Sequence, residues 1–308
     1  AKGKERSEIF RKIFGTGYLY EFQEKIKKEF LRVLPEMEIT FQTVRKNNGV
    51  DLHAITIKAK HSNVAPSIYL DGYFMEYQNG LELNDIISEI VTLVLKPVPD
   101  KFSTVVEDFC DINFVKERII MVAVNAAKNQ ELLNEVPHQI KLDLALIYKV
   151  VLDTTATVLV KNEHLKRWGI TAEELYTYAQ EGTKKLFPSS IQSMFDILQE
   201  MVPGEIPENS EFPMYVITNS KSLYGAASIF LDETIEKLEK LSHQMNSKLY
   251  LMPSSIHAWI AISTKCGDVK ELSKMVSMVN STQVAEEDRL SDHIYLFDAE
   301  TKKISIVA

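Results

Sequence analysis

The order of hydrophobic periods along this chain constrains its fold more than any other feature of the sequence. Two short segments with alternating or continuous apolar residues precede a segment with helical spacing, and this order occurs about four times. Hairpins followed by helices favour antiparallel sheets, because a short turn can join antiparallel neighbours whereas parallel strands need long crossovers. The sequence therefore predicts an α+β fold, with antiparallel or mixed sheets built from repeated strand-strand-helix units and helices packed on one face.

The clearest unit lies near the start of the chain. Apolar residues recur every three or four positions over residues 19–33, which predicts an amphipathic helix that ends before Pro35. Apolar alternation over residues 37–41 and 52–57 flanks Asn48-Gly49, a dipeptide typical of tight hairpin turns. A helix followed by a β-hairpin is therefore expected here.

Later segments repeat these signals with unequal spacing. Residues 102–133 mix the two periods and are predicted to be mostly helical. Helices are expected at residues 86–94, 171–187, 235–245 and 269–279. Strands are expected at residues 68–70, 144–152, 157–160, 214–218, 226–231, 249–252, 258–263, 293–297 and 304–307.

Two proline-punctuated stretches predict the domain organisation of the 308 residues. Pro97 and Pro99 interrupt the first stretch, because neither can donate to a strand ladder. Pro203-Gly204 and the polar residues after it mark the second. We expect an N-terminal helix-hairpin-helix subdomain (1–98), a middle α+β subdomain (99–205) and a C-terminal α+β subdomain (206–308).

The composition indicates the cellular compartment of the protein and the classes of partner that it binds. The net charge of −8 comes from basic residues dispersed among more acidic ones, whereas nucleic-acid binders gather basic residues on one face. No run of about 18 apolar residues suggests a membrane span. Two cysteines are too few for a disulfide framework. The sequence predicts a soluble cytoplasmic protein that binds neither nucleic acid nor membrane.

Common enzyme signatures are missing from the sequence. There is no phosphate-binding loop, no H-E-x-x-H zinc helix and no G-x-S-x-G nucleophile elbow. Gly15-Thr16-Gly17 lacks both the third glycine and the preceding strand of a dinucleotide fingerprint. The histidines are too far apart in sequence to place two metal ligands on one helix face. No cofactor and no metal are therefore predicted.

One arrangement of residues nevertheless allows a hydrolase hypothesis. Ser254 or Ser255 would be the nucleophile, His257 or His293 the general base, and Asp292 the group that orients the base. The competing interpretation is structural: the serines form a turn between two strands, where their hydroxyls bond to backbone groups.

Five short segments along the chain are distinctive as a set. They are Val136-Pro137-His138 to Asp143-Leu144-Ala145, Asn162-Glu163-His164-Leu165 with Trp168-Gly169-Ile170-Thr171, Met214-Tyr215-Val216 with Thr218-Asn219, Pro253-Ser254-Ser255-Ile256-His257, and Val279-Asn280 with Thr282-Gln283-Val284. With them the chain resembles the domain of unknown function 5688, an uncharacterised family of Gram-positive anaerobes, from about Phe22 onward. The resemblance implies an intracellular bacterial protein and carries no activity, cofactor or catalytic residue.

The sequence favours a non-catalytic binding or regulatory protein for a protein partner or small ligand, with the Ser/His hydrolase as the alternative. Candidate binding residues are the polar groups that stand out in these segments and at nearby element ends: Asn162, His164, Asn219, Ser254, Ser255, His257, Gln283, Asp292 and His293.

Overall fold

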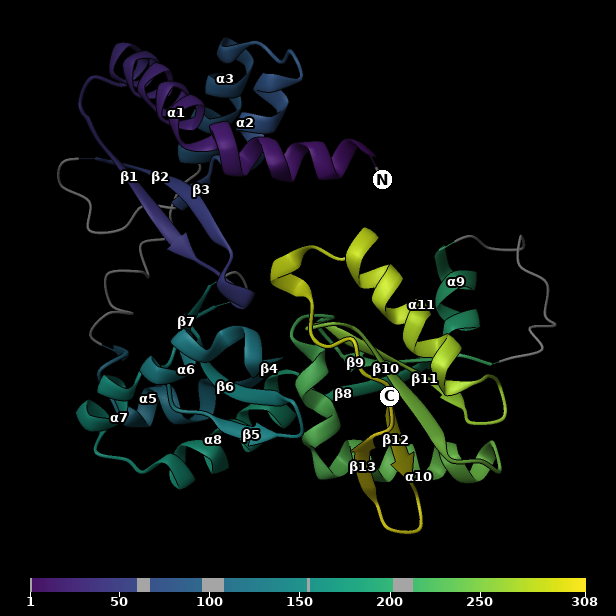
Figure 1. The fold of residues 1–308 in the computed structure, drawn as a ribbon. Helices are drawn as coiled ribbons and strands as arrows, with labels where there is room; N and C mark the ends of the chain where they lie inside the picture. The colour runs from purple at the N-terminus through teal and green to yellow at the C-terminus, as the bar shows by residue number, and fades with distance from the viewer. Residues whose placement is uncertain (1, 60–66, 96–107, 154–155, 202–212) are drawn as a thin grey trace. The chain divides into compact units, whose positions relative to one another are not determined.

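The computed structural model describes two compact units of the chain (Figure 1). The first unit contains the described residues up to 95 except Asn47–Gly49, and the second contains Asn47–Gly49 together with the described residues from 108 onward. The predicted boundaries at 98/99 and 205/206 lie outside the described residues and stay predictions. The described residues are 2–59, 67–95, 108–153, 156–201 and 213–308.

The first unit combines a three-stranded antiparallel sheet of order β1-β2-β3 with helices. The predicted helix and hairpin are confirmed, and the hairpin turn has positive φ at Asn48 and Gly49. Its elements are α1 (Lys2–Val33), β1 (Met37–Arg45), β2 (Asp51–Ala59), β3 (Ser67–Tyr69), α2 (Asp71–Gln78) and α3 (Leu83–Val94).

The core of this unit follows directly from the helical and strand periods. Phe22 and Phe30 of α1 are fully buried, as are Ile55 of β2 and Ile86 and Ile90 of α3. They form one hydrophobic cluster, so two helices and the sheet bury their apolar sides against each other.

The second unit begins with a four-stranded antiparallel sheet, in which β6 lies between β4 on one side and β5 and β7 on the other. The elements of this part are η1 (Asn47–Gly49), α5 (Ile112–Val115), η2 (Lys116–Arg118), β4 (Ile119–Asn125), η3 (Ala127–Asn129), α6 (Gln130–Glu135), β5 (Gln139–Lys141), β6 (Leu144–Val151), β7 (Thr157–Leu159), α7 (Asn162–Trp168) and α8 (Ala172–Leu186).

A six-stranded antiparallel sheet of order β13-β12-β10-β11-β9-β8 completes the second unit. Its strands and the helices between them are β8 (Ser189–Ser193), α9 (Met194–Met201), β9 (Tyr215–Asn219), η4 (Gly225–Phe230), α10 (Asp232–Gln244), β10 (Leu249–Ser255), β11 (Ala258–Ser263), α11 (Val269–Thr282), η5 (Glu286–Asp288), β12 (Tyr295–Asp298) and β13 (Lys303–Ile306).

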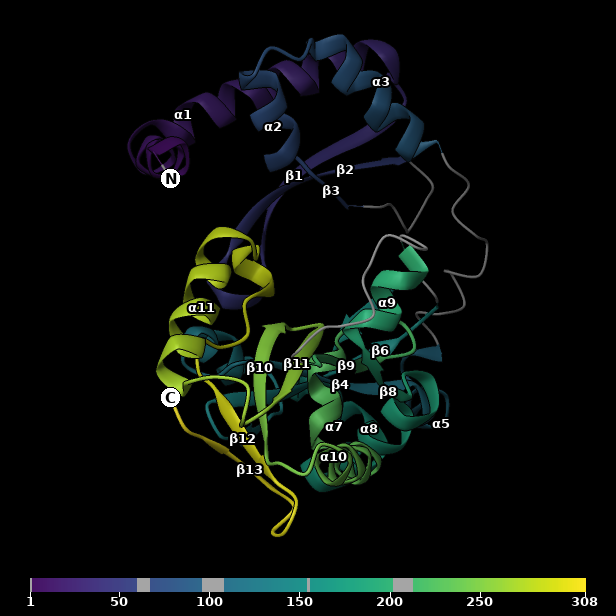
Figure 2. The same cartoon turned by 90° about the vertical axis from the view of Figure 1, so that its right-hand side faces the viewer.

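The α+β class is confirmed, but the six-stranded sheet carries a helix on each face. Leu251 of β10 faces the main core with Leu238 of α10. Its neighbour Met252 points to the opposite face and packs with Ile262 of β11 and Val276 of α11. Figure 2 shows α10 and α11 on different sides of these strands. The expectation of helices on one face is therefore wrong for this sheet, because its central strands are apolar on both sides.

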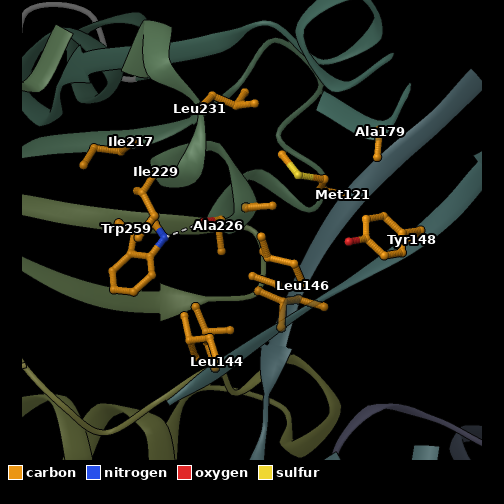
Figure 3. Packing of buried hydrophobic residues seen from close by; sticks show 14 of the residues in the cluster. Met121, Leu144, Leu146, Tyr148, Ala179, Ile217, Ala226, Ile229, Leu231 and Trp259 are labelled. Carbon is orange, nitrogen blue, oxygen red and sulfur yellow. Dashed lines mark hydrogen bonds between the residues drawn. The ribbon is translucent and has the colours of Figure 1, made fainter. Parts of the chain in front are cut away.

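One hydrophobic core joins the two sheets of the second unit (Figure 3). Tyr148 of β6, Trp259 of β11 and Tyr295 of β12 are almost fully buried in it. The rings of Trp259 and Tyr295 meet edge to face with centroids 4.9 Å apart, a favourable arrangement for aromatic pairs. The indole N–H of Trp259 donates to the carbonyl oxygen of Ala226 at 2.9 Å.

The secondary structure predicted for two segments is wrong. Within residues 102–133, Ile119–Asn125 forms the strand β4, whose residues are buried on both faces. Residues 226–231 were expected to be a strand but belong mainly to the 3-10 helix η4. Short continuous apolar runs do not distinguish a buried strand from a buried helix by period alone, which explains both errors. The predicted helix over residues 171–187 is confirmed as α8, and Thr171 and Glu174 form a capping box at its start.

Replacing Gly182 of α8 by alanine is expected to lower the free energy of unfolding by about 1–3 kcal/mol. A Cβ atom at this position would overlap the backbone carbonyl of Ile119, which cannot move aside without shifting β4. Chemical denaturation measures the effect. In the control Gly72→Ala, a Cβ atom meets nothing within 4 Å, so stability stays equal or rises. A Gly182→Ala variant as stable as the parent would contradict this close packing.

Candidate functional site

A polar segment of the second unit, residues 286–291, connects α11 to β12 and is held by asparagine side chains. Their amide groups donate to successive backbone carbonyls, so the backbone position of the segment is defined by side chains from other elements. The bonds are Asn47 to Glu287 (2.7 Å), Asn48 to Glu286 (2.6 Å) and Arg289 (2.8 Å), Asn125 to Leu290 (2.9 Å), and Asn280 to Ser291 (2.9 Å). We call residues 286–291 the amide-held segment.

Asp143, in the turn between β5 and β6, accepts hydrogen bonds from three side chains at the end of this segment. Its Oδ2 accepts from the Ser291 hydroxyl at 2.7 Å and from His293 Nδ1 at 2.9 Å, and its Oδ1 accepts from the Tyr295 hydroxyl. Burial raises the pKa of Asp143, but the hydrogen bonds from Tyr295, Ser291 and His293 outweigh it and hold the pKa below its usual range. Burial, and then the bond to Asp143, raises the pKa of Tyr295.

This contact fixes which nitrogen of the His293 ring carries a proton. A carboxylate can only accept, so Nδ1 carries a proton and the neutral ring presents a lone pair at Nε2. The His293 side chain is 50% exposed. Asp292 accepts instead from the amide of Asn280 at 2.7 Å. Asp143 is therefore the carboxylate that bonds to His293, whereas Asp292 bonds to Asn280, and the orienting role of Asp292 stays a prediction.

His257 is held in the opposite state. Its Nδ1 accepts the backbone N–H of Tyr224 at 3.0 Å, so the proton of the neutral ring lies on Nε2. Its Nε2 lies 3.5 Å from Asp288 Oδ1 in the amide-held segment, longer than a well-formed hydrogen bond. The carbonyl of His257 accepts from the Thr218 hydroxyl at 2.8 Å. Its ring is consequently fixed between β9, the turn before η4 and the amide-held segment.

Tyr224 connects His257 to a lysine. Its backbone has φ 56° and ψ 23°, a left-handed conformation that costs about 1–3 kcal/mol in a residue other than glycine. The following Gly225 packs so closely that a Cβ atom would overlap the Thr218 hydroxyl and the His257 carbonyl. The Tyr224 hydroxyl accepts from Lys149 Nζ at 2.7 Å, and the Tyr224 and His257 ring centroids are 5.8 Å apart.

The predicted serines lie at the end of β10, just before His257. The Ser255 hydroxyl accepts the backbone N–H of His257 at 3.0 Å, which is the turn interaction expected from the structural interpretation. Within the described residues, no hydrogen bond joins the hydroxyl of Ser254 or Ser255 to the ring of His257 or His293. The Ser/His hydrolase stays the alternative hypothesis.

Asn219 and Gln283, two further predicted residues, form hydrogen bonds with residues close to them in sequence. The Asn219 amide donates to the Leu223 carbonyl at 2.7 Å and so orders the turn that leads to Tyr224. Gln283, after α11, contacts the Thr282 hydroxyl at 3.5 Å.

Asn162 and His164 belong to α7, and their polar atoms bond to nearby backbone groups. The Asn162 amide donates to the Asn134 carbonyl, and His164 Nδ1 accepts the backbone N–H of Lys161. Burial beside the Phe109 and Trp168 rings lowers the pKa of His164. These contacts stabilise the start of α7, so binding by either residue stays a prediction.

The sequence reasoning missed four residues of the site: Asp143, Lys149, Tyr224 and Asp288. For Lys149 a signal existed, because it is the one charged residue in the apolar run 144–152. A charge in a segment that is otherwise buried needs a reason. For the others, sequence gives no comparable signal, since their roles depend on contacts between distant segments.

A hollow of about 410 Å³ lies elsewhere, beside α8 and η2. Glu117, Glu181 and Lys185 are exposed, and Glu117 and Lys185 pair with each other at 2.7 Å. The lining residues are Lys116, Glu117, Tyr178, Glu181, Gly182 and Lys185, none of which was predicted from the sequence. Within the described residues, no group of three or more His, Cys, Asp or Glu side chains is arranged to hold a metal ion.

The fold and the site define an α+β protein whose half-buried polar side chains converge beside the amide-held segment. A family model with the description "Family of unknown function (DUF5688)" matches residues 18–299. The chain belongs to this family. Comparison with curated proteins and with solved structures found no match. Among the described residues, no helix combines the length and the apolar character needed to cross a membrane.

Replacing Asp143 by asparagine is expected to lower the free energy of unfolding at pH 7 by about 2 kcal/mol, because three donors lose a charged acceptor. The folded-state pKa of Asp143 lies below its usual value. Its stabilisation is therefore fully present above the unfolded pKa of about 3.9 and is lost as the pH falls through the folded pKa. Denaturant titrations from pH 7 to pH 3 should show the difference between parent and variant shrinking.

The matched control is Asp292→Asn, an exposed position in the same region, where an amide oxygen can still accept from Asn280. Its effect on stability should be small at every pH. A stability difference for Asp143→Asn that does not change with pH would contradict the role assigned to this carboxylate.

Proposed function

We propose that this chain is a non-catalytic binding or regulatory protein of the bacterial cytoplasm, which recognises a protein partner or a small ligand. One observation carries the proposal. Two of the groups that a hydrolase would use are engaged in backbone bonds, since the Ser255 hydroxyl accepts from His257 N–H and His257 Nδ1 accepts from Tyr224 N–H. A general base needs an available lone pair beside the proton of the nucleophile.

These hydrogen bonds favour the binding of a ligand, because they hold polar side chains in fixed positions. Lys149, Tyr224 and His257 come from three separated segments and are held in place by the strand β6, the Asn219 turn and the β10–β11 turn. Polar groups fixed on a rigid framework lose little conformational entropy when a ligand binds. We therefore place the binding site at Lys149, Tyr224, His257 and Asp288.

Charge and cysteine content support the cellular setting. The net charge of −8 is unfavourable for a nucleic-acid partner. Two cysteines in 308 residues are typical of a protein in a reducing compartment. These features support a cytoplasmic protein whose partner is a protein or a small molecule.

A thermal-shift screen of metabolites with the full chain tests the proposal. A true ligand at 100 times its Kd stabilises the folded state by about 2.7 kcal/mol, and we expect mass spectrometry to recover it unchanged after incubation. Hydrolysis of the ligand by the parent protein, abolished in Ser255→Ala and in His257→Gln, would establish the hydrolase instead. Ser281→Ala, which changes an exposed serine of α11, is the control.

A further inference from the structure

Lys149 carries a positive charge on a half-buried side chain. It lies in β6, where every residue from Leu144 to Tyr148 is buried. Its Nζ atom lies 2.7 Å from the Tyr224 hydroxyl and 4.3 Å from the centroid of that ring. Within the described residues, Lys149 forms no ion pair. Lysine is rarely buried without a partner, because removing an ammonium group from water is costly.

A neutral phenol satisfies one hydrogen of the ammonium group but does not neutralise its charge. The same bond leaves the phenol proton of Tyr224 available, because the oxygen acts as acceptor toward Lys149. Two donors, the ammonium group and the phenol O–H, are therefore adjacent. This combination suits an anionic oxygen, which accepts from both and supplies the missing charge.

The position of the phenol is fixed by the backbone around it. Tyr224 is held in a left-handed conformation, with its N–H bonded to His257 Nδ1, and Gly225 after it permits no side chain. Strained conformations persist where the surrounding structure imposes them and are common at ligand sites. His257 is thus a positioning residue, which acts through the backbone of Tyr224.

We propose that Lys149 and Tyr224 bind the anionic group of a small ligand, a carboxylate or a phosphate. This inference rests on the proposed binding function and names the ligand chemistry of the same site. Asp288 lies beside His257, and its negative charge disfavours a second negative charge nearby. A singly charged carboxylate is therefore favoured over a phosphate dianion.

The first test titrates the full chain with sodium acetate and, separately, with inorganic phosphate at constant ionic strength. NMR follows the Tyr224 amide and the His257 ring. We expect saturable shifts with a Kd of about 10 mM or lower for a fragment of the ligand, and an affinity loss of at least tenfold in Lys149→Met. In Lys248→Met, whose exposed lysine is paired with Asp298, the affinity should not change.

A second readout guards against misfolding of the variant. Removing an uncompensated ammonium group is expected to raise the midpoint of thermal unfolding of Lys149→Met in anion-free buffer, so that a well-folded variant is available. Acetate should then stabilise the parent protein and not the variant. Tyr224→Phe, which keeps the ring and loses the hydroxyl, should weaken the binding several-fold.

Comparing the acetate titration with the phosphate titration distinguishes the two classes of anionic ligand. Tighter binding of acetate assigns a carboxylate ligand, and tighter binding of phosphate assigns a phosphorylated one. Absence of saturable shifts with both anions, or equal binding by Lys149→Met, would overturn the anion site. A neutral metabolite that binds in the thermal-shift screen would leave the wider proposal of a binding protein standing in that case.

Discussion

The buried indole of Trp259 imposes the constraint on which the second unit depends. An indole N–H in a hydrophobic core has to find an acceptor, and the carbonyl of Ala226 supplies it. To reach that position the chain passes close to β9 and to the turn between β10 and β11, which Gly225 permits because it has no side chain. The backbone N–H of Ala226 bonds in turn to the Ile256 carbonyl. The core thereby determines where Tyr224 and His257 lie.

The surroundings of the two histidines beside the amide-held segment determine which ring nitrogen carries the proton. A backbone donor faces Nδ1 of His257, whereas a carboxylate faces Nδ1 of His293. The first neutral ring therefore presents a donor at Nε2 and the second an acceptor. Residues of one type in one region of the fold thus have opposite hydrogen-bonding roles.

Local signals in the sequence predict the parts of the fold that local interactions determine. The helix over residues 19–33, the Asn48-Gly49 turn and the helix over residues 171–187 depend on residues close together in sequence, and all three are confirmed. The strand β4 and the helix η4 were missed because burial on all sides removes the hydrophobic period. At the site, His257 was predicted, whereas Asp143 and Tyr224 were not, because their importance arises from contacts between distant strands. The Ser255 hydroxyl, predicted as a possible nucleophile, accepts a backbone hydrogen bond in the turn before β11.

The strand order of the six-stranded sheet also has a consequence for how the chain reaches this structure. β10 and β11 form a hairpin, as do β12 and β13, so these pairs need only short loops to close. The junctions of β9 with β11 and of β10 with β12 join distant segments, which α10 and α11 respectively separate. Closing such loops costs entropy that a preformed helix reduces, since it shortens the free chain between the strands. The sheet can thus assemble outward from its central hairpin, with each helix serving as the compact linker that recruits the next strand.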